Sequence, residues 1–294
     1  MSRTYLILGA AGMLGNACMG AIGGPDDRVL GTVRSAADKA LFRPEIREHI
    51  IEGVDADDVR TVERVIADTR PAVVVNCIGV VKQLAAAEDP LIALPLNALF
   101  PHRLARICAA AGARLIHIST DCVFDGKRGL YRETDRPDAD DLYGISKRLG
   151  EVDYPGAITL RTSIIGHELK GARSVVDWFL SQAGSVDGYT RAIFSGLPTV
   201  ELARVIRDQV VPRPDLRGLY HVSADPISKF DLLRLVAETY GHDIEIVASE
   251  RVVIDRSLDS TRFRDATSWA PPAWPELVRR MHAEAPTAPR GVSQ

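Results

Sequence analysis

The chain has 294 residues, of which 46% are hydrophobic and 26% are charged, values that are ordinary for a globular protein. Its formal net charge is −3 and no run of Lys and Arg forms a stripe, so nucleic acid and anionic membranes are not expected partners. The four cysteines form no CxxC pair and the seven histidines form no HExxH arrangement. This pattern favours reduced thiols over a disulfide framework, and no metal site is expected.

The N-terminal segment MSRTYLILGAAGMLGNACMGAIGG has an early Arg and an apolar stretch, and it superficially resembles a signal peptide. Gly9, Gly12 and Gly15 interrupt the apolar stretch, and no later segment reaches the ~18 apolar residues of a membrane span. We therefore interpret it as the first strand and helix of the fold and expect a cytoplasmic protein.

Short apolar runs alternate with amphipathic segments over the first 165 residues. The expected strands are 5–8, 29–33, 50–53, 72–79, 114–120 and 157–165, and the expected helices are 13–22, 36–42, 57–69, 97–111 and 142–152. This alternation predicts an α/β fold with a doubly wound parallel sheet of the Rossmann type. Ligands of such sheets bind at the carboxyl ends of the strands.

Beyond residue 165 the pattern is less regular. Helices are expected over 175–182, 200–210 and 227–240, a strand over 218–222, and late Trp and Pro residues suggest a compact, irregular C-terminal lobe. We expect a dinucleotide-binding domain over 1–165 with returning segments around 190–223. A smaller, interleaved substrate-binding lobe then takes up 166–189 and 224–294.

The segment GAAGMLG places Gly9, Gly12 and Gly15 between the first expected strand and helix. The tight turn needs glycine, and backbone N–H groups at the helix start can receive a pyrophosphate. A glycine triplet by itself also serves plain helix–strand packing. Its place at the first strand–helix junction favours nucleotide binding.

Two residues bear on the choice of cofactor. Arg34 ends the second strand, where an acidic residue would bind the ribose 2′-hydroxyl and an Arg suits a 2′-phosphate. We therefore expect NADPH, with NADH as the alternative if Arg34 is only a solvated surface charge. Asp55 follows the third strand, and it is equally compatible with a hydrogen bond from the adenine amine and with capping the next helix.

The segment DLYGISK puts Tyr143 and Lys147 four residues apart on one helix face. A phenol titrates near pH 10, and a cation one turn away is expected to lower the pKa of Tyr143 toward the working range. The pair lies one helix after the strand that ends at Ser119 and Thr120, so the Thr120 hydroxyl can reach the same substrate oxygen.

Four motifs, GAAGMLG, HISTDCVFDG, DLYGISK and ITLRTSIIG, resemble in this order the extended short-chain dehydrogenase/reductase family. More narrowly, they are similar to dTDP-4-dehydrorhamnose reductases and related sugar-nucleotide 4-ketoreductases, and DRSLDSTRF is similar to a C-terminal segment of that group. The resemblance implies a catalytic triad of Thr120, Tyr143 and Lys147. It also implies hydride transfer from NADPH to the C4 ketone of a nucleotide-activated 4-keto-6-deoxysugar.

The resemblance further assigns binding residues. For the cofactor it implies Gly9, Gly12, Met13, Leu14, Gly15, Cys77, Ile78, Gly79, Asn97, Tyr143 and Lys147, beside Arg34 and Asp55 above. For the substrate we expect Lys82, Asp121, Cys122, Val123, Arg191 and Arg256. The last two are candidates for the substrate diphosphate because a guanidinium forks phosphate oxygens, although surface ion pairs are the commoner role.

Departures from the reductase pattern leave alternatives open. Cys122 stands where the reductases usually have Tyr, and where dehydratases of the superfamily place a second carboxylate after Asp, so dehydration is disfavoured. With no cation in its motif, a nucleophilic role for Cys122 has no support. Lys82 and Gln83 are expected either to face the substrate or to lie in a solvated loop. His117 is expected to be a core histidine, and the strand end Arg161-Thr162-Ser163 could flank the nicotinamide or the substrate.

Three broader alternatives also stay open. The same Tyr and Lys pair serves nucleotide-sugar epimerases, which retain their nicotinamide. The regulatory subunit of methionine adenosyltransferase resembles this reductase group and acts as an NADP-binding partner without catalysis. A homodimer is one option for assembly.

Overall fold

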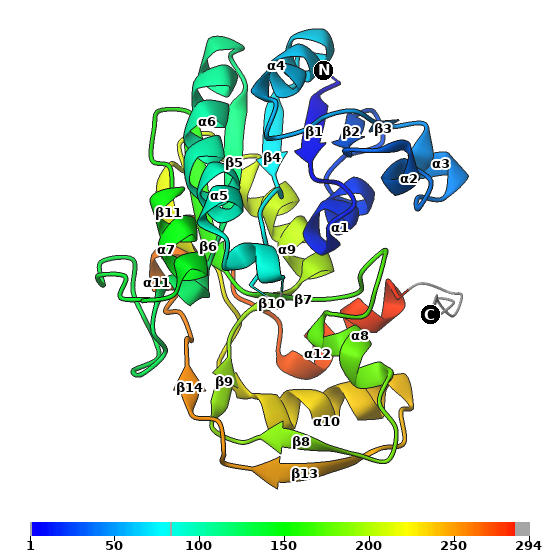
Figure 1. The fold of residues 1–294 in the computed structure, drawn as a ribbon, viewed down its shortest axis with the longest axis vertical. Helices are drawn as coiled ribbons and strands as arrows, with labels where there is room; N and C mark the ends of the chain where they lie inside the picture. Colours follow the sequence, from blue (N-terminus) through cyan, green and yellow to red (C-terminus); the bar gives the residue numbers. More distant parts are fainter. Residues whose placement is uncertain (1, 83, 286–294) are drawn as a thin grey trace.

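The computed structural model describes residues 2–82 and 84–285, and a sheet of seven strands forms its centre (Figure 1). Gln83 lies outside the described residues. The strands are β1 (Thr4–Leu8), β2 (Arg28–Thr32), β3 (Ile50–Ile51), β4 (Val73–Asn76), β5 (Arg114–Thr120), β6 (Ala157–Thr162) and β11 (Gly218–His221). Their order is β11-β6-β5-β4-β1-β2-β3, and every neighbouring pair is parallel. The winding reverses between β1 and β4, which confirms the predicted doubly wound Rossmann fold.

Helices cover both faces of the sheet, because alternate residues of each strand are apolar and buried. Tyr5 and Ile7 of β1 belong to one hydrophobic cluster, and Leu6 and Leu8 belong to another. The first cluster includes residues of α1 (Met13–Ala21), α9 (Thr199–Val205) and the π-helical η4 (Ile206–Val210). The second includes residues of α4 (Val59–Thr69) and α6 (Phe100–Ala110), with α7 (Leu142–Leu149) next to β5.

The helix expected to begin at Asn97 begins earlier. It runs from α5 (Pro90–Ala93) through a π-helical segment, η2 (Leu94–Leu99), into α6. The Asp89 side chain accepts a hydrogen bond from the Leu91 N–H at 2.9 Å, and Pro90 occupies the first helical position. Both features favour a helix start at this point. The expected boundary was therefore wrong, and Asn97 lies within the π-helical segment.

Short elements connect these layers. They are α2 (Ala36–Lys39), α3 (Pro44–Arg47), η1 (Ala85–Ala87), η3 (Asp121–Val123), β7 (Ile164–Ile165), β10 (Leu197–Pro198) and α11 (Thr261–Thr267). β7 pairs in parallel with β10, and α11 lies against β11.

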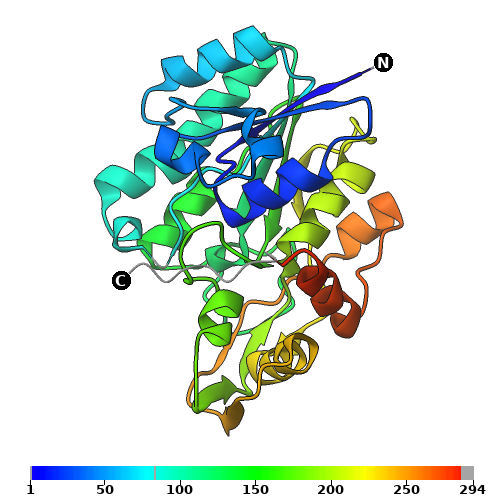
Figure 2. The same cartoon turned by 90° about the vertical axis from the view of Figure 1, so that its right-hand side faces the viewer.

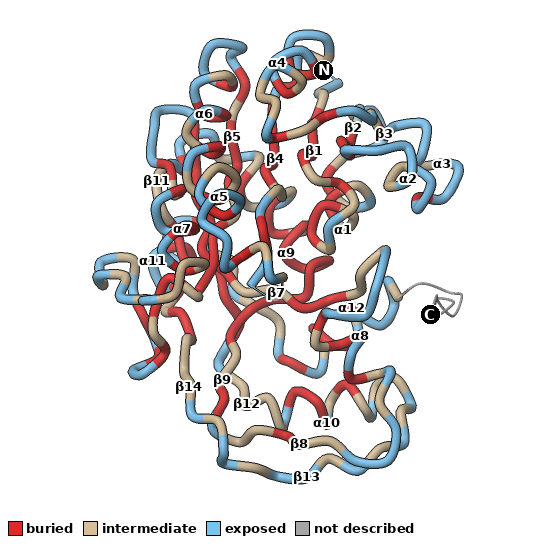
Figure 3. Tube along the Cα trace, viewed as in Figure 1, coloured by how far each residue is buried: buried red, intermediate tan, exposed pale blue. Residues whose placement is uncertain are grey.

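A smaller lobe lies below the carboxyl ends of the central strands (Figures 1 and 2). It contains α8 (Val175–Leu180), β8 (Ser185–Tyr189), β9 (Ala192–Phe194), β12 (Ile227–Ser228), α10 (Lys229–Tyr240), β13 (Glu245–Ser249) and β14 (Ile254–Asp255). β8 pairs in parallel with β13, whereas β9 lies between β12 and β14. Much of β13 faces solvent (Figure 3). The division into a dinucleotide-binding domain and a substrate-binding lobe stays a prediction.

The C-terminal segment is more regular than expected, because α12 (Trp274–Ala283) is a helix of ten residues. Pro275 lies in its first turn, where a missing N–H costs no intrahelical hydrogen bond. Pro and Trp residues therefore mark the start of a helix here. Within the described part of the chain, no helix has both the length and the apolar character needed to cross a membrane.

Candidate active site

A cavity of about 360 Å³ lies at the carboxyl ends of β1, β2 and β4, where the winding of the sheet reverses. Its lining includes the predicted cofactor residues Gly9, Gly12, Arg34, Asp55, Cys77, Ile78 and Gly79. Gly9 has φ +78°, and a Cβ at this position would lie 3.0 Å from Cγ1 of Ile78. Only glycine lets the β1–α1 turn come this close to the end of β4.

Three other residues of the glycine motif do not line this cavity. Leu14 is buried in the core, and Met13, the first residue of α1, lines a separate hollow with Thr199 and Val200 of α9. A Cβ on Gly15 would lie 2.2 Å from the Gly9 carbonyl oxygen, so Gly15 permits close packing of helix and turn. Any contact of these residues with a pyrophosphate must use backbone N–H groups, which have no intrahelical acceptor in a first turn. Their cofactor role stays a prediction.

The far end of the cavity carries one cation and several carboxylates. Arg34 is exposed at its rim, and Asp55 lies in its wall. The capping alternative for Asp55 is wrong, because Asp58 is the residue that caps α4 and accepts a hydrogen bond from the Arg60 N–H. The glycine turn, the polar far end and Gly79 at the near end together fit a dinucleotide such as NADP.

Asn97 joins three segments behind the cavity. Its Oδ1 accepts a hydrogen bond from the Val80 N–H at 2.9 Å, and its Nδ2 donates to Oγ of Ser146 at 3.2 Å. A Cβ on Gly79 would lie 3.1 Å from Asn97 Oδ1 and 3.8 Å from Lys147 Nζ. Asn97 therefore supports the cofactor cavity from behind, and it links the end of β4 to the helix that carries Lys147.

Tyr143 and Thr120 come together as predicted, although the pKa of Tyr143 moves in the opposite direction. Burial raises this pKa above its usual value, and the nearby Cys122 raises it further, whereas a hydrogen bond with Thr120 lowers it. The expectation that Lys147 lowers it is wrong for this structure. Nζ of Lys147 points toward β5, where it donates a hydrogen bond to the Ile118 carbonyl at 2.8 Å. Tyr143 is thus a neutral phenol that holds a proton.

Lys147 itself is buried, and burial lowers its pKa to about 8. The charged form of an amine is penalised when water is removed from around it. Thr120 is also buried, and its Oγ1 accepts a hydrogen bond from the Cys122 N–H at 3.1 Å. The hydroxyl, the phenol and the ammonium therefore gather at the end of β5 and on the first turns of α7.

A second cavity, of about 560 Å³, lies between the carboxyl ends of β5 and β6 and the smaller lobe. Asp121, Cys122 and Arg256, three of the residues predicted to bind the substrate, line it, and their role stays a prediction. Arg256 donates a hydrogen bond from Nε to the Phe124 carbonyl at 2.8 Å. Burial raises the pKa of Asp121 and raises that of Cys122 to about 12. The thiol is therefore protonated at neutral pH, which agrees with the absence of a nucleophilic role.

Several residues of the second cavity were missed by the sequence reading. They include Trp178, Gln182, Tyr189, Phe194 and Lys229, whereas Ser163, which also lines the cavity, belongs to the segment expected to flank the ligands. Helical spacing places Trp178 on an expected helix, yet nothing in its local pattern separates a cavity residue from a core residue. Lys229 follows Ser228, the N-cap of α10, and this cap was the one feature of the sequence that could have placed Lys229 at the start of a helix.

The structure does not bring three of the predicted substrate residues to this cavity. Lys82 is absent from its lining and forms an ion pair at 2.6 Å with Asp141, the N-cap of α7, although its charge still acts on Cys122. The Val123 side chain is fully buried in a small hydrophobic cluster. Arg191 is exposed in the turn between β8 and β9. Arg161, expected to flank the ligands, is buried in an ion pair with Glu151.

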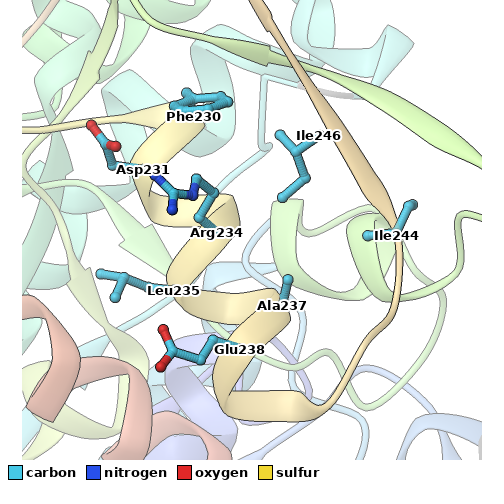
Figure 4. Close-up of a pocket in the computed structure, with 8 residues that line it drawn as sticks. All are labelled: Phe230, Asp231, Arg234, Leu235, Ala237, Glu238, Ile244 and Ile246. Atoms are coloured by element: carbon cyan, nitrogen blue, oxygen red, sulfur yellow. The ribbon is translucent and has the colours of Figure 1, made fainter.

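Two further observations delimit the site. Within residues 2–82 and 84–285, no group of three or more His, Cys, Asp or Glu side chains is arranged to hold a metal ion. A third hollow, of about 590 Å³, lies between α10 and the segment leading into β13, and is lined by residues such as Phe230, Arg234 and Ile246 (Figure 4). None of the predicted site residues lies in it.

The comparisons with known proteins agree with this geometry. The family model described as the RmlD substrate binding domain matches residues 3–285. A dTDP-4-dehydrorhamnose reductase of Streptomyces griseus is 37% identical over 148 residues, which cover 50% of this chain and 43% of the relative. Methionine adenosyltransferase 2 subunit beta of Xenopus laevis is 28% identical over 253 residues, 82% of this chain and 73% of the relative.

Among solved structures, the dTDP-4-dehydrorhamnose reductase of Bacillus anthracis in complex with NADP has a TM-score of 0.79 to this chain. It is 20% identical and covers 97% of this chain and 100% of its own, so it supports the fold. The Rossmann sheet and the family match define an oxidoreductase class, the extended short-chain dehydrogenases/reductases. Within this class, the chain belongs to the RmlD family, that of the dTDP-4-dehydrorhamnose reductases.

Proposed function

We propose that the chain reduces the C4 ketone of a nucleotide-activated 4-keto-6-deoxysugar with NADPH, in deoxysugar or polysaccharide biosynthesis. The observation that carries this proposal is the position of the triad between two cavities. Lys147 lies beside Gly79 of the cofactor cavity, and Thr120 directly precedes Asp121 and Cys122 of the second cavity. A ketone held between the cavities can meet both a cofactor and a proton donor.

The reaction divides between the cofactor and the chain. NADPH, when bound, supplies the hydride for the ketone carbon. Tyr143 holds the proton that the ketone oxygen needs, and its raised pKa keeps that proton in place at neutral pH. Thr120 can donate a hydrogen bond to the same oxygen, where negative charge develops. Lys147 supplies a positive charge near Gly79, beside the place assigned to the nicotinamide ribose.

The second cavity fits a nucleotide sugar. Arg256 and Lys229 provide two cations for a diphosphate, and Trp178 and Tyr189 provide aromatic surface. Asp121 and Cys122 lie nearest the triad in sequence and are assigned to the sugar. A cytoplasmic location, a homodimer and the absence of nucleic-acid partners stay predictions.

One specific observation favours a second candidate. The relatives that cover 81–82% of this chain are named as the beta subunit of methionine adenosyltransferase 2, and not as reductases. In this alternative the chain binds NADP and a partner protein without turning over a keto sugar. Thr120, Tyr143 and Lys147 argue against it, because a binding module needs no proton donor.

The deciding experiment follows NADPH oxidation with a panel of nucleotide 4-keto-6-deoxysugars. Replacing Tyr143 by Phe removes the proton donor, and we expect kcat to fall by about 100-fold or more with little change in NADPH affinity. Tyr154→Phe is the matched control, because Tyr154 lies outside the lining of both cavities and its hydroxyl forms a hydrogen bond with Nδ1 of His102 at 2.9 Å.

Each other outcome has a defined meaning. Near-normal turnover by Tyr143→Phe would contradict the role of Tyr143 as the proton donor. Conversion of a sugar without net NADPH consumption would indicate an epimerase. NADPH binding with no turnover of any keto sugar, together with a co-purifying protein, would favour the regulatory subunit.

A further inference from the structure

A buried ion pair lies beneath the triad, outside both cavities. Arg161 of β6 donates hydrogen bonds from Nε and Nη2 to the two carboxylate oxygens of Glu151, each at 2.6 Å. The Arg161 side chain is 4% exposed and that of Glu151 is 12% exposed. Such a two-point pair in a dry environment fixes both side chains in place.

Glu151 also reaches the strand that carries the catalytic Thr120. Ser119 Oγ donates a hydrogen bond to Glu151 Oε1 at 2.7 Å, and Lys147 Nζ donates to the carbonyl of Ile118 at 2.8 Å. Lys147 and Glu151 are four residues apart, at and just beyond the end of α7. The two side chains therefore contact consecutive residues of β5, immediately before Thr120.

We propose that Glu151 is a positioning residue for Lys147: its carboxylate, held by Arg161 and Ser119, fixes the end of β5 against α7 and keeps the buried lysine charged. The inference rests on the proposed function for the catalytic importance of Lys147. The electrostatic link between the two residues does not depend on that function.

The charges around Lys147 agree with this role. Burial lowers the pKa of Lys147 to about 8, and Glu151 is the largest influence in the opposite direction, followed by Cys77, the residue after β4. Two other titratable neighbours are neutral. Burial holds the pKa of His117 on β5 well below its usual value, and that of Tyr143 above its usual value. Glu151 is thus the main source of negative charge that favours the ammonium form.

Arg161 is the positive charge that faces the same region from β6. Removal of the Glu151 charge leaves Arg161 and Lys147 as two cations without a carboxylate between them, so Lys147 should lose its proton at a lower pH. Removal of the Arg161 charge leaves the carboxylate uncompensated, so Lys147 should keep its proton to a higher pH. The two substitutions therefore move one titration in opposite directions.

The test is a side-chain NMR titration of the full chain labelled with ¹³C,¹⁵N-lysine, without cofactor or substrate. The sequence has six lysines, and Lys147→Arg assigns the signal of interest. We expect Glu151→Gln to lower the titration midpoint of Lys147 by about one pH unit or more, and Arg161→Gln to raise it. Arg148→Gln is the matched control, because Arg148 is exposed next to Lys147 and its removal should shift the midpoint far less.

The single variants leave one buried charge unpaired and are expected to be less stable. The double variant Glu151→Gln, Arg161→Gln removes both charges, and circular dichroism reports whether each variant folds. In the double variant the titration midpoint of Lys147 should also fall, because Glu151 acts on Lys147 more strongly than Arg161 does. The decrease should be smaller than in Glu151→Gln.

Two results would overturn the proposal. One is a shift of both single variants in the same direction, or a Glu151→Gln shift no larger than that of Arg148→Gln. The other is an unchanged or raised titration midpoint of Lys147 in the double variant. This result decides the matter if the single variants do not fold. Failure of the reductase assay would leave these midpoints unaffected, so the two proposals fail separately.

Discussion

At the scale of single residues, Arg34 is the residue predicted to decide between the two nicotinamide cofactors. It is the one Lys or Arg among the described residues that line the cofactor cavity, and Asp38, Asp55 and Asp57 line the same end. The Asp38 carboxylate accepts a hydrogen bond from the Ser35 hydroxyl at 2.8 Å, which holds it beside Arg34. Without Arg34, this end of the cavity would repel a 2′-phosphate.

We therefore predict that Arg34→Asp lowers kcat/KM for NADPH relative to NADH by about tenfold or more, because a charge-assisted hydrogen bond is replaced by repulsion. Arg28→Asp, at the opposite end of β2, makes the same change of charge away from the cavity. Dissociation constants from nucleotide fluorescence give the same comparison without a substrate. An unchanged cofactor preference in Arg34→Asp would show that Arg34 is only a surface charge.

The residue-level predictions that succeeded are those in which spacing dictates proximity. Tyr143 and Lys147 share one helix face because they are four residues apart, and Thr120 meets them because β5 precedes α7. The direction of the Tyr143 pKa could not be predicted, because it depends on burial and on where the Lys147 ammonium points. Val123 was misplaced for a related reason, since motif position does not say which way a side chain faces. Arg191 was a candidate only because a guanidinium suits a diphosphate, and residue type alone does not place a side chain.

At the scale of elements, the β1–α1 junction depends on contacts that only glycine allows. A Cβ on Gly15 would lie 2.2 Å from the Gly9 carbonyl oxygen and 2.9 Å from the Ala10 Cα, whereas a Cβ on Gly20, also in α1, would meet nothing within 4 Å. Gly15→Ala should therefore push the helix away from the turn, and we expect it to lower the free energy of unfolding by about 1–3 kcal/mol.

The matched change Gly20→Ala should raise the free energy of unfolding by about 0.5–1 kcal/mol, because Ala favours a helix and no neighbour must move. Urea denaturation measures both effects, and a fluorescence titration with NADPH shows whether Gly15→Ala also weakens binding. Equal responses of the two variants would contradict a specific contact at the glycine turn.

Element boundaries were predicted well where hydrophobic period and caps agree, as for β5, α4 and α10. The π-helical segment around Asn97 had no such signal, and it packs against α7, which is distant in sequence. The two small sheets of the lobe were missed for a different reason. Their strands are two to five residues long, and they pair only with segments distant in sequence.

At the scale of the whole molecule, the lobe and the sheet share one core. A single cluster of buried side chains includes Tyr5 and Ile7 of β1, Leu202 of α9, Leu233 of α10 and Leu277 of α12. Sequence periodicity indicated that α10 has an apolar face but could not show that this face joins the core of the sheet. The predicted lobe is therefore a part of the same folding unit, although its chain segments are separate.

This shared core predicts cooperative unfolding. Leu277 is fully buried in it, so Leu277→Ala should lower the free energy of unfolding by about 2–5 kcal/mol. All three tryptophans, Trp178, Trp269 and Trp274, lie in the C-terminal half, so their fluorescence reports on the lobe, and circular dichroism reports on the whole chain. With one core, both signals should shift together in denaturant.

The control is Leu91→Ala, at a side chain that is 83% exposed, which should change the free energy of unfolding by no more than about 0.5 kcal/mol. A tryptophan transition that moved to lower denaturant while the dichroism transition stayed in place would show instead that the lobe unfolds on its own.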